Sequence, residues 1–170
     1  MFLYARRRYS LSPGLFERIT SIMSQIIQIK YHDTFSGEPL EKLKMLDQGD
    51  WIDLRAAEEV SLKAGEFKLI SLGVSMKLPD GYEAHIAPRG STFLKHGIIQ
   101  ANHLGIVDNS YSGDNDIWHF PAIALRDTYI PKNTRICQFR IVKKMPPVVF
   151  VEIDRLEGPD RGAFGSTGEK

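Results

Sequence analysis

The chain of 170 residues is 42% hydrophobic and 25% charged, which fits one globular domain large enough to bury a proper core. Its formal net charge of +1 gives no reason to expect nucleic acid as a partner, because proteins that bind many phosphates usually carry a basic surplus. The single cysteine, Cys137, excludes an intrachain disulfide framework and a cysteine zinc site, and it favours a reducing, cytoplasmic location.

Residues 1–22 differ in composition from the rest of the chain. They hold four arginines and one acid, Glu17, and they lack an apolar run of transmembrane length, so we expect no membrane partner. We interpret them as a basic N-terminal extension or leader outside the fold. A transit peptide is the second interpretation, since the segment is rich in Arg and Ser. A helix capped by Ser12, with Pro13 in its first turn, is the third.

A β-rich domain is expected over residues 23–157. Short apolar stretches alternate there with Gly, Pro, Asp or Asn turns, and no long amphipathic helix interrupts them. This pattern predicts an all-β sandwich, jelly roll or barrel. The expected strands lie near residues 25–31, 51–56, 66–78, 82–87, 97–101, 104–107, 117–125, 135–142 and 147–153.

An acid stands in the otherwise apolar strand near residues 51–56. Asp53 is costly to bury there unless it meets a cation or a hydrated metal ion. Pairing with a nearby arginine and a functional role explain this acid about equally well.

A polar turn follows the strand near residues 82–87. Arg89, Gly90, Ser91 and Thr92 offer a guanidinium, hydroxyls and free backbone N–H groups, a combination that suits an anion. An ordinary helix cap explains the same residues equally well.

The stretch 102–113 combines a short strand with polar groups at both of its ends. Gly105 allows a close backbone approach, and the strand that follows holds the acid Asp108 at a rigid end. Asn102 offers a donor and an acceptor before the strand, and Tyr111 offers a flat face after it. These residues indicate a site for a planar polar ligand with a candidate base. On residue types alone, an ordinary β-hairpin is the commoner explanation.

A glutamine occurs in the strand after the Ile-Pro-Lys turn. Alternation predicts Ile136 and Gln138 on one face, with Arg135, Cys137 and Phe139 on the other. A glutamine beside an apolar neighbour suits a ligand, although an edge glutamine in water is more common.

Residues 158–170 are expected to form a flexible arm, because they are rich in Gly, Ser and charge and nearly without core-forming side chains. A phosphate-binding P-loop is excluded, since that motif needs Gly-Lys-Ser/Thr at the start of a helix. Arg161 and Phe164 nevertheless provide a bidentate cation and a ring, and Ser166 and Thr167 provide hydroxyls. This set is sufficient to close over a nucleoside triphosphate.

Taken together and in this order, five segments over roughly residues 45–170 resemble the five motifs of the trimeric dUTP pyrophosphatases. The chain departs from that family at Gly90, where a serine is usual, and in the short spacing between Arg161 and Phe164. The segments are Asp53-Leu54-Arg55-Ala56, Pro88-Arg89-Gly90-Ser91, Gly105-Ile106-Val107-Asp108-Asn109-Ser110-Tyr111-Ser112-Gly113, Asn133-Thr134-Arg135-Ile136-Cys137-Gln138 and Ala163-Phe164-Gly165-Ser166-Thr167-Gly168.

The resemblance implies a distorted jelly-roll subunit and a homotrimer with active sites between subunits. It also implies Mg²⁺-dependent hydrolysis of dUTP to dUMP and pyrophosphate. By the family's roles, Asp108 activates the attacking water, Arg161 binds the γ end, and Asp53 helps to hold Mg²⁺ through water. The implied contacts to base and sugar are Asn102, Gly105, Ile106, Val107, Tyr111 and Phe164. The implied contacts to phosphates are Arg89, Gly90, Ser91, Gln138, Ser166 and Thr167, and Gly165 is a further implied substrate contact.

Three other functions remain open from the sequence. A dCTP deaminase, or a bifunctional deaminase and pyrophosphatase, shares the implied fold, although cytosine presents the reversed donor and acceptor at one edge. A regulatory nucleotide-binding module keeps the pocket without needing Asp108 as a base. A structural jelly roll without a ligand leaves Asp108 and Arg161 unexplained.

Overall fold

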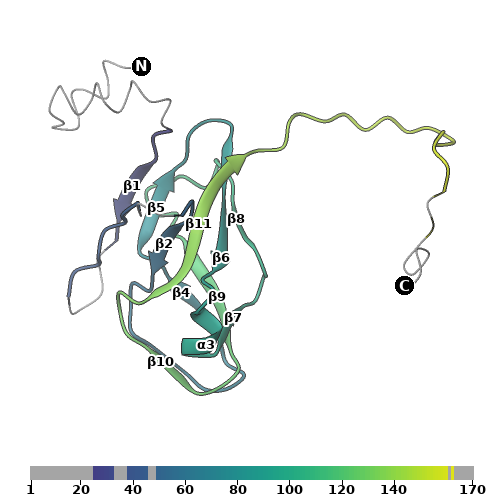
Figure 1. Ribbon diagram of the computed structural model, residues 1–170. Coiled ribbons are helices and arrows are strands. Elements are labelled where there is room, and N and C mark those ends of the chain that lie inside the picture. Colours follow the sequence, from purple (N-terminus) through teal and green to yellow (C-terminus); the bar gives the residue numbers. More distant parts are fainter. Residues whose placement is uncertain (1–24, 33–37, 46–48, 161, 163–170) are drawn as a thin grey trace, which may run out of the picture.

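The computed structural model describes residues 25–32, 38–45, 49–160 and 162 (Figure 1). The extension predicted for residues 1–22 lies outside them, as does most of the arm. Short strands and one short helix make up the described part. They are β1 (Gln28–Tyr31), β2 (Ile52–Arg55), β3 (Val60–Leu62), β4 (Phe67–Ser71), β5 (Val74–Lys77), β6 (Tyr82–Pro88), α3 (Thr92–His96), β7 (Ile98–Gln100), β8 (Gly105–Val107), β9 (His119–Ala124), β10 (Thr128–Ile130) and β11 (Arg135–Lys143).

Two antiparallel sheets carry the body of this fold. The larger has the strand order β2-β11-β6-β8, and the smaller has the order β4-β9-β7. The pairs β1–β5 and β10–β3 complete the strand pairing, and each of them is also antiparallel. Figure 1 shows β11 running across the body beside β2 and β6. The predicted all-β architecture is confirmed.

The core is one cluster of buried side chains from both sheets. Trp118 and Phe139 meet at its centre with ring centroids 5.3 Å apart and planes at 86°. Burying one such ring stabilises the fold by about 2–3 kcal/mol. Phe139 precedes the exposed end of β11, and its burial also sets which way the neighbouring Gln138 side chain points, because successive strand residues face opposite sides.

The single strand predicted over residues 66–78 is wrong, because Leu72 and Gly73 divide it into β4 and β5. Gly73 has a positive φ of 64°. A Cβ on it would lie 2.7 Å from side-chain carbons of both Ala57 and Leu40, so only glycine fits this turn. The chain crosses here from the pairing of β4 with β9 to the pairing of β5 with β1.

The strand predicted over residues 147–153 is also wrong, since no strand follows Lys143 in the described residues. This segment leads away from the body of the fold (Figure 1). Val149 is 87% exposed and Phe150 is 94% exposed, although both are typical strand residues. Their side chains favour a strand, but a strand needs a neighbour to accept its backbone hydrogen bonds, and the described residues provide none here. The other predicted strands are present with shifted ends, whereas β3 and β10 were not predicted.

The predicted alternation in β11 fails at its first residues. The pairing with β2 slips between Arg135 and Cys137, which is a β-bulge. Ile136 and Cys137 are therefore both fully buried, and Ile136 does not share a face with the half-buried Gln138.

Candidate active site

Three of the predicted motifs meet in one row across the larger sheet. Gln138 of β11 lies opposite Asp53 of β2 on one side and opposite Ala87 of β6 on the other. The Gln138 amide nitrogen donates to the Pro88 carbonyl oxygen at 3.3 Å. Segments far apart in the sequence thus bring a carboxylate, an amide and the start of the 88–91 turn together.

The Asp53 carboxylate joins two arginines. Its Oδ1 lies 2.7 Å from Arg89 Nε, and its Oδ2 lies 2.9 Å from Arg135 Nη1. Only 12% of its side chain is exposed, whereas 43% of Arg135 is exposed. The structure therefore gives this acid the arginine pairing that the sequence left open, and two cations next to one carboxylate leave a positive surplus for an anionic ligand.

The 88–91 turn is tied to the sheet by a residue that the motifs do not include. Thr92 Oγ1 accepts a hydrogen bond from the Arg89 N–H at 3.1 Å and donates one to the Ile136 carbonyl oxygen at 2.7 Å. Ser91 starts helix α3 but makes no capping hydrogen bond with its side chain. Gly90 is exposed, and a Cβ there would meet nothing within 4 Å. The Ser91 hydroxyl and the Gly90 backbone are thus accessible to a ligand.

The hairpin around β8 lies at the edge of the same sheet. Gly105 pairs with Ile86, and a Cβ on Gly105 would lie 3.1 Å from the Ile86 Cβ. Ile106 is 61% exposed, and Val107 is partly buried. The backbone of β8 is thus accessible from one side, which suits close contact with a flat ligand.

Asp108 follows β8 in an exposed turn. Its carboxylate accepts hydrogen bonds from the Ser110 hydroxyl and, at 2.7 Å, from the Ser110 N–H. These two bonds, the hydroxyl first, lower the pKa of Asp108 below its ordinary value. Tyr111 is 43% exposed, and its hydroxyl donates to the Ile117 carbonyl oxygen at 3.3 Å. Asp108 is therefore an ionised acceptor at neutral pH, with an aromatic ring three residues away.

Within one protomer, Asp108 lies far from the arginine cluster, which consists of Arg89 and Arg135 around Asp53. Val107 lies opposite Ala84 on β6, and Arg89 comes five residues later on that side of the sheet. At about 3.3 Å per residue, this separation is roughly 16 Å, and Asp108 extends it in the opposite direction. Asp53, Arg89 and Gln138 are brought together, whereas Asp108 and Tyr111 are not brought to them.

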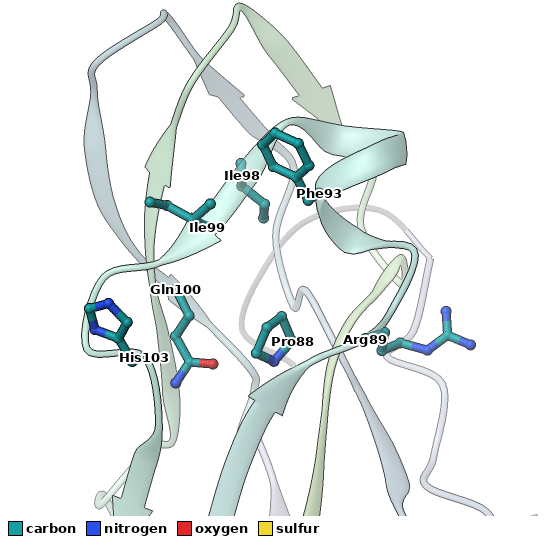
Figure 2. A pocket seen from close by; sticks show the side chains of 7 residues that line it. All are labelled: Pro88, Arg89, Phe93, Ile98, Ile99, Gln100 and His103. Carbon is teal, nitrogen blue, oxygen red and sulfur yellow. The ribbon is translucent and has the colours of Figure 1, made fainter. Parts of the chain in front are cut away.

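A hollow of about 240 Å³ lies between these two regions, where β6 ends and β7 begins. Pro88, Arg89, Gln100 and His103 are among its lining residues. Figure 2 shows the Arg89 side chain turned away from Gln100, toward the outer side of the hollow. The guanidinium therefore pairs with Asp53 and does not approach Gln100.

The side chains available as metal ligands restrict how Mg²⁺ can be bound. Among the residues described, no group of three or more His, Cys, Asp or Glu side chains is arranged to bind a metal ion. Both Asp53 oxygens already face guanidinium groups. Mg²⁺ commonly keeps several waters and takes phosphate oxygens with one or two carboxylates. The residues present thus fit an ion that a polyphosphate carries rather than an ion in a protein cage.

Two neighbours of the predicted site residues were missed: Gln100 and Arg135. Gln100 had a signal, because it is a polar residue at an inward position of β7, between an exposed Ile99 and a turn. A polar side chain on a buried face needs a specific partner. Arg135 had none, since its partner depends on strand register. The predicted residues Arg161, Phe164, Gly165, Ser166 and Thr167 lie outside the described residues.

Fold and site together define an antiparallel β protein with a cationic cluster for an anionic ligand and an exposed carboxylate on a hairpin. No helix in the described part of the chain is long and apolar enough to cross a membrane. A sequence model of the dUTPase family matches residues 51–168. The SPbeta prophage-derived deoxyuridine 5'-triphosphate nucleotidohydrolase YosS of Bacillus subtilis (strain 168) is 59% identical over 144 residues, which are 85% of this chain and 99% of that protein.

Two solved structures have a similar fold. A mutant dUTPase from phage phi11 of Staphylococcus aureus, described with a structural Mg(II) ion, has a TM-score of 0.65 and 15% identity, over 78% of this chain and 99% of its own. A mutant of Staphylococcus bacteriophage 80alpha dUTPase with dUpNHpp has a TM-score of 0.64 and 16% identity, over the same shares. From the family match and the 59% identical relative, the chain belongs to the dUTPase family.

Proposed function

We propose that this protein hydrolyses dUTP to dUMP and pyrophosphate. The observation that carries the proposal is the 59% identity to a deoxyuridine 5'-triphosphate nucleotidohydrolase over 99% of that relative's length. The site geometry agrees with it, because a triphosphate needs clustered cations and an attacking water needs a base.

Asp108 is the proposed base. Its ionised carboxylate takes a proton from water while the water oxygen bonds to the α-phosphorus. The bond from that phosphorus to its bridging oxygen breaks, and pyrophosphate leaves with the bonding electron pair. Arg89, Ser91 and Gln138 are proposed to hold the phosphate oxygens, and Tyr111 to lie beneath the deoxyribose. Mg²⁺, when bound to the triphosphate, supplies further neutralisation of charge on its oxygens.

A pH profile tests the role of Ser110, whose hydroxyl is the main cause of the lowered pKa of Asp108. A lowered pKa keeps Asp108 ionised further into the acid range, so Ser110→Ala is expected to raise that pKa. The acidic limb of the profile of kcat against pH should then move to higher pH, with little change above neutrality. Ser112→Ala, in the same loop, is the matched control. An identical acidic limb in all three proteins would contradict this link.

A homotrimer with sites between subunits is part of the proposal. The separation of roughly 16 Å between the hairpin and the arginine cluster supports it, because one α-phosphate cannot meet both Asp108 and Arg89 of the same protomer. The exposed apolar segment with Val149 and Phe150 supports association as well, since monomeric proteins rarely expose such a stretch. Size-exclusion chromatography with light scattering measures the assembly directly.

The C-terminal residues are proposed to cover the bound nucleotide, with Arg161 on the phosphates and Phe164 on the base. Deleting residues 159–170 is expected to lower kcat/KM about 100-fold or more, because a positioned cation and a closed site are lost together. Thermal unfolding and the assembly state should stay unchanged, since the described residues 158–160 are exposed. Full activity of the truncated protein would argue against a cover.

One assay separates this function from its rivals. The protein is incubated with Mg²⁺ and each deoxynucleoside triphosphate in turn, and pyrophosphate and ammonia are measured. Pyrophosphate from dUTP without ammonia from dCTP is the expected result. Ammonia from dCTP would indicate a deaminase, and nucleotide binding without either product would indicate a regulatory module.

A further inference from the structure

Gln100 holds a buried position at the end of β7, next to the hairpin. Only 5% of it is exposed. Its amide nitrogen Nε2 donates to the Ile86 carbonyl oxygen at 3.2 Å and to the Asn102 side-chain oxygen Oδ1 at 2.9 Å. Both hydrogens of this nitrogen are thus used, one on the backbone of β6 and one on the candidate base-recognition residue.

The surroundings allow only this orientation of the Gln100 amide. With the amide reversed, its oxygen would face the Ile86 carbonyl oxygen, and no hydrogen would lie between them. Close packing prevents the amide from moving away, because even a Cβ on Gly105 would lie 3.3 Å from Gln100 Nε2. This orientation leaves one polar atom of the amide unsatisfied. Within the described residues, Gln100 Oε1 is buried without a hydrogen-bond partner. Figure 2 shows this amide at the wall of the hollow.

A fixed Gln100 fixes Asn102 in turn. The turn after β7 folds back at His103, which has a positive φ of 58° and whose N–H donates to the Gln100 carbonyl oxygen at 3.1 Å. Asn102 is exposed, and its Oδ1 is engaged by Gln100. Among the described residues its Nδ2 has no partner. The side chain therefore directs its Nδ2 donor toward a ligand and its oxygen toward Gln100.

We propose that Gln100 is a positioning residue that makes this site select uracil over cytosine, an inference that rests on the proposed dUTP hydrolysis. Uracil carries a carbonyl oxygen at C4, which accepts from Asn102 Nδ2. Cytosine carries an amino group there, which meets that donor with a donor of its own. Sites that present one fixed polar group reject the mismatched ligand by up to about 10⁴-fold, because buried polar groups are left unpaired.

The test compares two non-hydrolysable probes, the α,β-imido analogues of dUTP and dCTP, by calorimetric measurement of Kd. Gln100→Met keeps the approximate volume and removes both donor hydrogens, so Asn102 is free to turn. The ratio of the two Kd values should then move toward unity by about 10- to 100-fold. Ile99→Met is the matched control on the exposed face of β7 and should leave the ratio unchanged.

Two further variants separate positioning from general structural support. Gln100→Glu keeps the size but presents an acceptor to Asn102 Nδ2, and it should lower the preference for the dUTP analogue at least as far. In an Asn102→Ala background, Gln100→Met should no longer change the ratio, because the group it positions is absent. Equal weakening of both probes, or a ratio that Gln100→Met and Gln100→Glu leave unchanged, would overturn the inference while dUTP hydrolysis stands. A wild-type protein without preference for the dUTP analogue would overturn this inference, whereas a lack of pyrophosphate from dUTP would overturn the proposed function.

Discussion

Asp108→Asn is expected to lower kcat for dUTP by about 10²- to 10⁴-fold, the usual contribution of a positioned general base. The amide keeps the shape of the carboxylate but cannot take the proton from water. Its oxygen can still accept from Ser110, which now holds Asp108 in its exposed turn. The Kd of the non-hydrolysable dUTP analogue should therefore change by less than about tenfold.

The matched control for this variant is Asp114→Asn. Asp114 is an exposed acid of the same loop, but it pairs with Lys30 rather than facing the hairpin. Single-turnover kinetics with dUTP and calorimetry with the analogue measure both proteins. Near-normal turnover by Asp108→Asn, or an equal loss in Asp114→Asn, would remove Asp108 from the role of base.

Mixing two inactive variants is expected to restore activity. Arg89→Ala should lose activity because it removes the phosphate cation and leaves Asp53 with a single arginine partner. If Asp108 and Arg89 of one site come from different subunits, random mixed trimers with Asp108→Asn regain intact sites. In an equal mixture about a quarter of the sites should be intact, since each position draws the wild-type residue half of the time.

Co-expression of the two variants with different affinity tags yields mixed trimers for this assay. Each variant co-expressed with a differently tagged copy of itself is the control, and both controls should stay inactive. An inactive mixed trimer would contradict sites divided between subunits. Mixed trimers isolated on both tags should have about a third of wild-type kcat per subunit, because each of them has one intact site in three. That result would support the proposed assembly in a way that a size measurement alone cannot.

Local patterns in the sequence predicted three residues that the sheet brings together. Asp53, Arg89 and Gln138 belong to separate motifs, and the sheet brings them together through the register of β2, β11 and β6. Strand signals are local, because alternation and turn residues act over a few positions. Hence most strands were predicted, and errors arose where a distant contact intervened, as at Gly73 against Ala57.

Val149 and Phe150 illustrate the limit of local propensity. Both favour a strand, yet their segment has no partner strand in the part of the chain that the structure describes. Propensity reports that a residue suits a sheet, whereas a sheet also requires a neighbouring backbone. The prediction for residues 147–153 failed for this reason.

The sequence by itself determined the all-β class, the motifs and the acid on the hairpin, since these follow from residue types at fixed spacings. Only the tertiary structure decided that Asp53 pairs with Arg89 and Arg135, and that Asp108 lies far from them along the sheet. It also decided that the Gln100 amide donates a hydrogen bond to the Asn102 side-chain oxygen. Each of these facts depends on strand register and on the direction of a side chain, which are set by packing between segments distant in the chain.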